Sequence, residues 1–231
     1  LIYLIPTFQN PGGFTMPLEK RRAIYDIALR HEVMILEDNP YGELRFAGEN
    51  IPTIKSMDTE GIVLYSSSFS KILSAGMRIG YLCGPEPVVQ KMVVAKQSED
   101  VHTNIFFQML TYRYMTECDL DAHIKAINDL YRAKCTLMLK TLDESMPEGV
   151  HYTRPEGGLF IWMTLPEKIR MEDFVKRAIE QKVAVVPGST FLCDTEARIN
   201  AVRLNYSTPS DDDIVKGCRI LGMVAGEMLG E

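Results

Sequence analysis

The chain has 231 residues, of which 46% are hydrophobic and 24% charged, ordinary values for a globular protein. A formal net charge of −6 and the lack of a long basic run argue against nucleic acid as a partner of this segment. No apolar stretch approaches the roughly 20 residues that cross a bilayer, and the first residues lack the charged lead of a signal peptide.

The cysteines exclude two further classes of protein. Their number is odd, they are scattered, and no two form a C-x-x-C pair, so neither a disulfide framework nor a zinc site is expected. A reducing cytoplasm is the simplest compartment for such a chain. The five positions are Cys83, Cys118, Cys135, Cys193 and Cys218.

The first part of the chain reads as strands around one helix. Short apolar runs predict buried strands at residues 2–5, 33–36 and 62–65. A helix is predicted over residues 17–30, because a proline opens it and apolar residues recur on one face. Strand, helix, strand with short connections favours an α/β fold with a mostly parallel sheet flanked by helices.

Farther along, strands and helices stop alternating regularly, which predicts a smaller α+β domain. We place the boundary near the long helix, giving domains of residues 1–125 and 126–231. The first residue is not Met and already begins a predicted strand, so we expect the native protein to extend further toward its N-terminus. The remaining predicted elements are strands at residues 79–83, 150–152, 159–164, 184–186 and 202–206, and helices at residues 88–98, 105–116, 120–145, 174–181 and 211–229.

Polar side chains gather where the first three predicted strands end. Ligands of an open parallel sheet bind beyond the carboxyl ends of its strands. If these strands are neighbours, an amide, a carboxylate, a phenol, hydroxyls, an amine and a guanidinium meet there. Each alone is also compatible with an ordinary turn or surface position. The residues are Asn10, Asp38, Tyr41, Ser68, Ser70, Lys71 and Arg78.

Five ordered segments carry these residues and two further groups. They are Gln9-Asn10-Pro11-x-Gly13; Asp38-x-x-Tyr41; Ser68-Phe69-Ser70-Lys71 with Arg78-Ile79-Gly80; Pro155-Glu156-Gly157-Gly158-Leu159-Phe160-Ile161-Trp162; and Arg203-Leu204-Asn205-Tyr206-Ser207. In order and spacing they resemble the signature of the class I/II aminotransferases, which are pyridoxal-phosphate enzymes of fold type I. The resemblance covers essentially the whole chain.

The resemblance implies a role for each residue that would hold pyridoxal 5'-phosphate. Lys71 would form the Schiff base with the cofactor aldehyde and later transfer a proton. Asp38 would keep the pyridine nitrogen protonated, so that the ring accepts electrons. Tyr41 and Asn10 would bind the phenolic oxygen of the cofactor. The phosphate would be held by Ser68, Ser70 and Arg78, the arginine through charge-assisted bonds.

The resemblance also implies a substrate site. Arg203 would grip the α-carboxylate of the amino acid at two points, which fixes the α-C–H bond relative to the cofactor ring. Asn10 would contact the substrate as well, and the Asn10–Pro11 bond would be cis, which aims the Asn10 amide at the cofactor. The pair Gly157-Gly158 would let backbone approach the substrate, although a tight turn before a strand explains it nearly as well.

Residues 1–125 would then be part of the large pyridoxal-phosphate-binding domain, and residues 126–231 an interdomain helix with the small domain. Further cofactor contacts of the family come from segments that would precede Leu1. Family members are usually homodimers. The run from Glu37 to Phe46 is similar to the 2-aminoadipate and broad-specificity branch, which implies 2-oxoglutarate as the amino-group acceptor.

Two other functions fit the same residues. The branch also resembles the effector domain of bacterial regulators that join a winged-helix domain to an aminotransferase-like domain. The standard Asn10-Pro11 mildly favours the enzyme. A carbon–sulfur lyase of the same fold would use the same cofactor residues, because one carbanion chemistry serves both reactions.

Overall fold

The computed structural model describes residues 1–194 and 197–230. The chain divides into two compact units. The first contains Leu1–Thr7 and Thr15–Asn128, and the second contains Phe8–Phe14 and Asp129–Glu231. No helix within the described residues is both long enough and apolar enough to cross a membrane.

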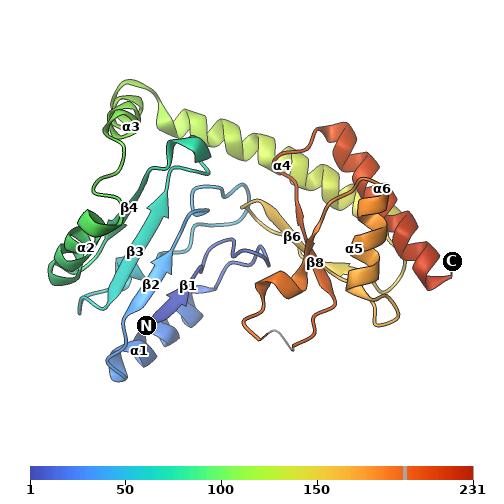
Figure 1. Ribbon diagram of the computed structural model, residues 1–231, viewed down its shortest axis with the longest axis horizontal. Helices are drawn as coiled ribbons and strands as arrows, with labels where there is room; N and C mark the ends of the chain where they lie inside the picture. Colours follow the sequence, from blue (N-terminus) through green and yellow to red (C-terminus); the bar gives the residue numbers. More distant parts are fainter. Residues whose placement is uncertain (195–196, 231) are drawn as a thin grey trace. The chain divides into compact units, whose positions relative to one another are not determined.

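The first unit is built on a four-stranded sheet in the order β1-β2-β3-β4, in which β1, β2 and β3 are parallel and β4 is antiparallel to β3. This confirms the expected mostly parallel sheet (Figure 1). The elements are β1 (Ile2–Leu4), α1 (Leu18–Arg30), β2 (Ile35–Asp38), η1 (Lys55–Met57), β3 (Val63–Ser68), η2 (Ala75–Met77), β4 (Gly80–Cys83), α2 (Glu86–Glu99), α3 (Ile105–Glu117) and the start of α4 (Leu120–Ser145).

A hydrophobic core joins α1 to this sheet. Tyr25 and Ala28 of α1 pack with Ile35 of β2 and Val63 of β3, and all four are buried. The apolar face predicted for the first helix, Ile24, Ile27 and Ala28, is met in part, because Ala28 is buried and Ile24 packs against the core while Ile27 is 46% exposed. This core holds α1 against β2 and β3, the strands whose carboxyl ends carry candidate site residues.

Strand β2 starts two residues later than the predicted span of residues 33–36. The backbone N–H of Val33 donates to the carbonyl of Ala28, at 2.9 Å, so Val33 still belongs to the turn that closes α1. Glu32, with φ of 52°, makes that turn in the left-handed region. Sequence periodicity missed this, because an apolar residue can serve a helix end as well as a strand.

A buried arginine ties together the segments around β2. Arg21 is fully buried and donates to the carbonyls of Met16, Pro52 and Pro6 at 2.9 to 3.1 Å. Its Nη1 also lies 3.9 Å from Oε1 of the buried Glu37. That carboxylate accepts the backbone N–H groups that open η1. These bonds satisfy both buried charges, as burial requires.

The second unit has its own four-stranded sheet, fully antiparallel, in the order β5-β6-β8-β7. The expected small domain of strands and helices without βαβ alternation is what this unit contains (Figure 1). Its elements are the remainder of α4, β5 (His151–Tyr152), β6 (Phe160–Thr164), α5 (Met171–Glu180), β7 (Val186–Pro187), η3 (Gly188–Phe191), β8 (Ala201–Asn205) and α6 (Asp211–Leu229).

The loop Phe8–Phe14 packs within the second unit, although it follows β1 in sequence. Phe8 is fully buried and lies against Gly158, so closely that a Cβ on this glycine would come within 2.6 Å of the Phe8 Cβ. A Cβ on Gly13 would come within 2.7 Å of the Phe160 carbonyl oxygen. Both glycines have positive φ, a conformation that favours glycine. The backbone conformation and the close packing therefore both require a residue without a side chain at these two positions.

Candidate active site

Asp38 ends β2, and a hydroxyl from each neighbouring strand binds its carboxylate. Tyr3 of β1 donates to Oδ2 at 2.7 Å, and Ser66 of β3 donates to Oδ1 at 2.9 Å. The register explains the arrangement, because Asp38 pairs with Ser66 and Tyr3 pairs with Leu36, two residues before Asp38 on the same face. No lysine or arginine in the described residues forms an ion pair with this carboxylate.

Sequence reasoning did not identify Tyr3 or Ser66. Tyr3 is 55% exposed, but partial desolvation of its phenol and the hydrogen bond to Asp38 raise its pKa to about 12, so the hydroxyl stays a donor at neutral pH. The signal that could have found both residues is the period-2 alternation of strands, which puts polar residues of adjacent strands on one face with Asp38. The sequence alone does not give the register.

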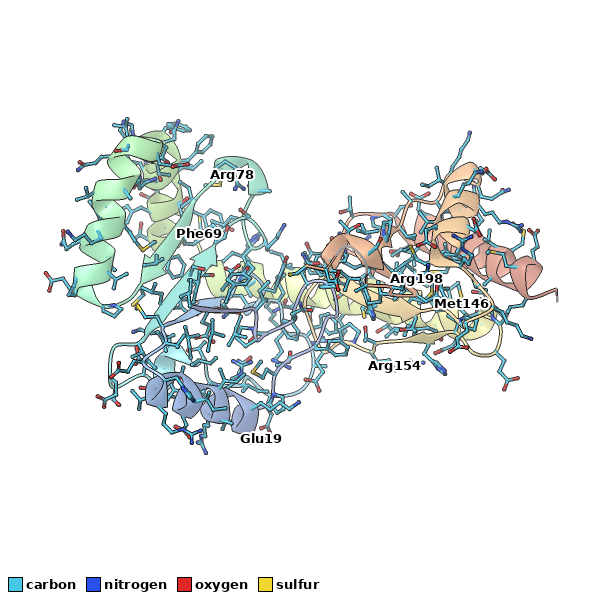
Figure 2. All side chains as sticks on the ribbon, turned by 60° about the horizontal axis from the view of Figure 1, so that its bottom comes forward. Glu19, Phe69, Arg78, Met146, Arg154 and Arg198 are labelled. Atoms are coloured by element: carbon cyan, nitrogen blue, oxygen red, sulfur yellow. The ribbon has the colours of Figure 1, made fainter. Side chains whose placement is uncertain are left out.

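A second polar cluster follows β3. Ser68 Oγ donates to Ser70 Oγ at 2.8 Å and accepts from the Ser70 backbone N–H at 3.0 Å. Arg78 Nη1 donates to Ser70 Oγ at 3.4 Å and to the Ala75 carbonyl at 3.2 Å. Arg78 ends η2 in the left-handed conformation and is exposed on the loop between β3 and β4 (Figure 2). Two hydroxyls and a guanidinium therefore gather in one place, as anion binding requires.

Lys71 directly follows this cluster and is partly buried. Within the described residues its amine makes neither a hydrogen bond nor an ion pair. The carbonyl of the next residue, Ile72, lies 2.8 Å from Nε2 of His123, a contact that fastens this turn to the start of α4. Tyr41 is buried in the turn after β2, where its carbonyl accepts the Leu44 N–H.

Asn10 and Arg203 meet in the second unit. Arg203 Nη1 donates to Asn10 Oδ1 at 2.6 Å, and the Asn10–Pro11 bond is cis, as the resemblance implied. The guanidinium lies over the ring of Phe160, 4.3 Å from its centroid, and 5.2 Å from that of Phe191. Cation–π contacts of this kind hold a guanidinium in a fixed plane.

The turn that carries Gly157 and Gly158 is held from β8. Tyr206, fully buried just after that strand, has its hydroxyl 3.0 Å from the carbonyl oxygen of Gly157 and 2.7 Å from that of Gly158. Burial strongly raises the pKa of Tyr206, so it remains a donor. The turn thus has a structural support that the sequence motif alone does not explain.

The predicted site residues therefore fall in two groups. Asp38, Tyr41, Ser68, Ser70, Lys71 and Arg78 belong to the first unit, while Asn10 and Arg203 belong to the second. All five cysteines are free thiols. In the part of the chain that the structure describes, no group of histidine, cysteine and acidic residues could hold a metal ion.

The model of the aminotransferase class I and II family matches residues 2–221, and the chain belongs to this family. A curated relative from Thermococcus litoralis, aromatic-amino-acid aminotransferase 1, is 42% identical over 96% of this chain and 53% of its own length. The 2-aminoadipate transaminase of Thermus thermophilus is 37% identical over 96% of this chain and 56% of its own length. The chain thus spans about half the length of the curated relatives it matches.

Solved structures give the same fold. The kynurenine aminotransferase of Pyrococcus horikoshii, in complex with PMP, KYN and KYA, superposes with a TM-score of 0.95 at 42% identity. That match covers 98% of this chain and 56% of the other. The uncharacterized HTH-type transcriptional regulator YdfD of Bacillus subtilis is also similar, 30% identical over 99% of this chain and 47% of its own length.

Proposed function

We propose that the protein is a pyridoxal-phosphate-dependent aminotransferase that moves an amino group from an L-amino acid to a 2-oxo acid, 2-oxoglutarate being the acceptor. The observation that carries this proposal is the set of Asp38, Lys71 and Arg78 around the carboxyl ends of β2 and β3, in a chain of the class I and II family. The names of the relatives support it, since they act on aromatic amino acids, 2-aminoadipate or kynurenine.

The residues present suit the cofactor chemically. A phosphate dianion needs hydroxyl donors and a cation, which Ser68, Ser70 and Arg78 provide within one hydrogen-bonded cluster. A pyridinium nitrogen needs a carboxylate whose charge is not neutralised by a cation, which describes Asp38. Lys71 provides an amine without a competing partner among the described residues.

When bound, pyridoxal phosphate supplies an aldehyde carbon and a ring that accepts an electron pair from the substrate. We assign Lys71 to hold the cofactor covalently through Nζ and then to carry a proton to and from the substrate α-carbon. Tyr41 and Asn10 would donate to the cofactor's phenolic oxygen. Arg203 would bind the substrate α-carboxylate, with Asn10 and Phe160 fixing the plane of its guanidinium.

The test is the absorbance of the native-length protein with pyridoxal phosphate, before and after a panel of L-amino acids. We expect a band near the visible edge that Lys71→Ala abolishes and that Lys20→Ala, an exposed lysine of α1, leaves in place. An amino acid that discharges the band, followed by recovery on adding 2-oxoglutarate, identifies the donor. A folded wild-type protein without any band contradicts the proposal.

The similarity to an HTH-type regulator favours a second candidate, a cofactor-binding effector domain. Such a protein would show the band, but no amino acid would convert it through a full cycle. A carbon–sulfur lyase would break the C–S bond of a sulfur amino acid and, with one water consumed, release a thiol or hydrogen sulfide, a 2-oxo acid and ammonia, without needing 2-oxoglutarate. The same absorbance experiment, with the products measured, separates these functions from a transaminase.

A homodimer in the cytoplasm belongs to the same proposal. Helix α3 supports the dimer, since Ile105, Phe106, Met109 and Tyr112 are each at least 60% exposed, a large apolar surface for one helix. Five free thiols suit a reducing compartment. Sedimentation of the native-length protein tests the dimer, and a monomer at micromolar concentration would contradict it.

A further inference from the structure

We propose that Tyr3 and Ser66 are positioning residues for Asp38, holding its carboxylate toward the ring nitrogen of pyridoxal phosphate through neutral donors alone. The inference rests on the proposed function and assigns two residues that the five family segments do not include. Its starting point is the pair of hydrogen bonds that bring one hydroxyl to each carboxylate oxygen.

The geometry restrains the carboxylate from both sides of its strand. Asp38 lies at the end of β2, the middle one of the three parallel strands, and the two donors come from its neighbours β1 and β3. A carboxylate bound at one oxygen can still rotate about its last side-chain bond, whereas one bound at both oxygens cannot do so without breaking a bond. Each oxygen retains a lone pair with which to accept a further proton donor.

The choice of donors matters as much as their placement. A lysine or arginine in either position would also orient Asp38, but would neutralise the charge that must stabilise a protonated ring nitrogen. Two hydroxyls orient the group and leave its negative charge intact. Besides Asp38, the titratable group that acts on the Tyr3 phenol is that of Tyr41. The phenol of Tyr3 stays protonated through the physiological pH range, so its hydroxyl continues to donate to Asp38.

Three variants test the inference in the native-length protein, with pyridoxal phosphate as the probe. Tyr3→Phe keeps the ring and removes only the hydroxyl, and Ser66→Ala removes the other donor. We expect each to raise the dissociation constant for pyridoxal phosphate about ten-fold, on the order of one hydrogen bond to a charged group. Ser66→Thr keeps a hydroxyl and should restore binding to near the wild-type value.

A spectroscopic readout separates positioning from mere loss of stability. The pH midpoint of the bound cofactor's visible band should shift in Tyr3→Phe in the same direction as in Asp38→Asn, and by less. Ser98→Ala on α2, which removes an exposed hydroxyl, should change neither quantity. A Tyr3→Phe protein with wild-type affinity and midpoint overturns this inference and leaves the proposed function intact. A wild-type protein that forms no band overturns the proposed function, and this inference with it.

Discussion

The guanidinium of Arg203 donates a 2.6 Å hydrogen bond to the side-chain oxygen of Asn10, although 193 positions separate the two residues. The bond joins strand β8 to the loop Phe8–Phe14, and both belong to the second unit. A charged donor at this length is among the stronger hydrogen bonds in proteins. The pair is therefore preorganised, so that the guanidinium would already be oriented when the carboxylate that we propose as its ligand binds.

Replacing Arg203 by lysine should raise the KM for the amino acid by about ten- to a hundred-fold, because an ammonium cannot make a planar two-point contact or stack on Phe160. Steady-state kinetics with the identified donor measures this. The matched control is Arg219→Lys, at an exposed position of α6, which should leave the KM unchanged. An unaltered KM in Arg203→Lys would remove this residue from the substrate site.

Removing the cation of the cluster formed by Ser68, Ser70 and Arg78 should weaken cofactor binding. We expect Arg78→Ala to raise the dissociation constant for pyridoxal phosphate by about ten- to a hundred-fold, since a charge-assisted bond to the phosphate is lost. Titration of the apoprotein followed by absorbance measures the constant. Arg113→Ala breaks an exposed pair with Glu117 on α3 and should leave cofactor binding as it is. Equal affinities of Arg78→Ala and wild type would contradict the assignment.

The buried pair of Arg21 and Glu37 should make stability depend on pH. We expect Arg21→Met to lower the free energy of unfolding by about 3–5 kcal/mol, because the Glu37 charge stays buried without its partner. Urea unfolding measures the loss. The control is the neighbouring Arg22→Met, which is exposed and should change stability by less than about 0.5 kcal/mol.

The sign of the pH effect follows from the pKa of Glu37. Burial raises this pKa, while the backbone N–H groups of Lys55 and Ile54 and the charge of Arg21 lower it. A carboxyl with a raised folded pKa loses stability as the pH rises through that value. Without Arg21 the pKa rises further, so Arg21→Met should be more destabilising at about pH 8 than at about pH 5. A loss equal at both pH values would contradict this account.

Two glycines should respond oppositely to the same change. Gly158→Ala should destabilise the protein by about 2 kcal/mol, because φ is +74° and the new Cβ would come within 2.6 Å of the Phe8 Cβ. Gly226→Ala, inside α6 with open space around it, should stabilise by about 0.5–1 kcal/mol. Urea unfolding of both variants gives the comparison. A neutral Gly158→Ala would show that the Phe8 contact relaxes at no cost.

Much of the secondary structure was predictable because the local signals agree with the fold. The helix predicted at residues 211–229 coincides with α6, whose buried face repeats at helical spacing. The helix predicted at residues 120–145 coincides with α4. The predicted strand boundaries were wrong where an apolar residue belongs to the end of a helix and not to the strand that follows, as at Val33. The strand predicted at residues 184–186 likewise falls early, since β7 is Val186–Pro187.

The sequence by itself determined the family and predicted the candidate site residues. Both were accessible because motifs such as Ser68-Phe69-Ser70-Lys71 depend on short spacing along one chain. Only the tertiary structure decided which groups meet. The strand register brought Tyr3 and Ser66 to Asp38, and packing against Gly158 placed the Asn10 loop in the second unit with Arg203. The physical reason is that register and loop packing depend on contacts between distant segments, which spacing within a single segment does not encode.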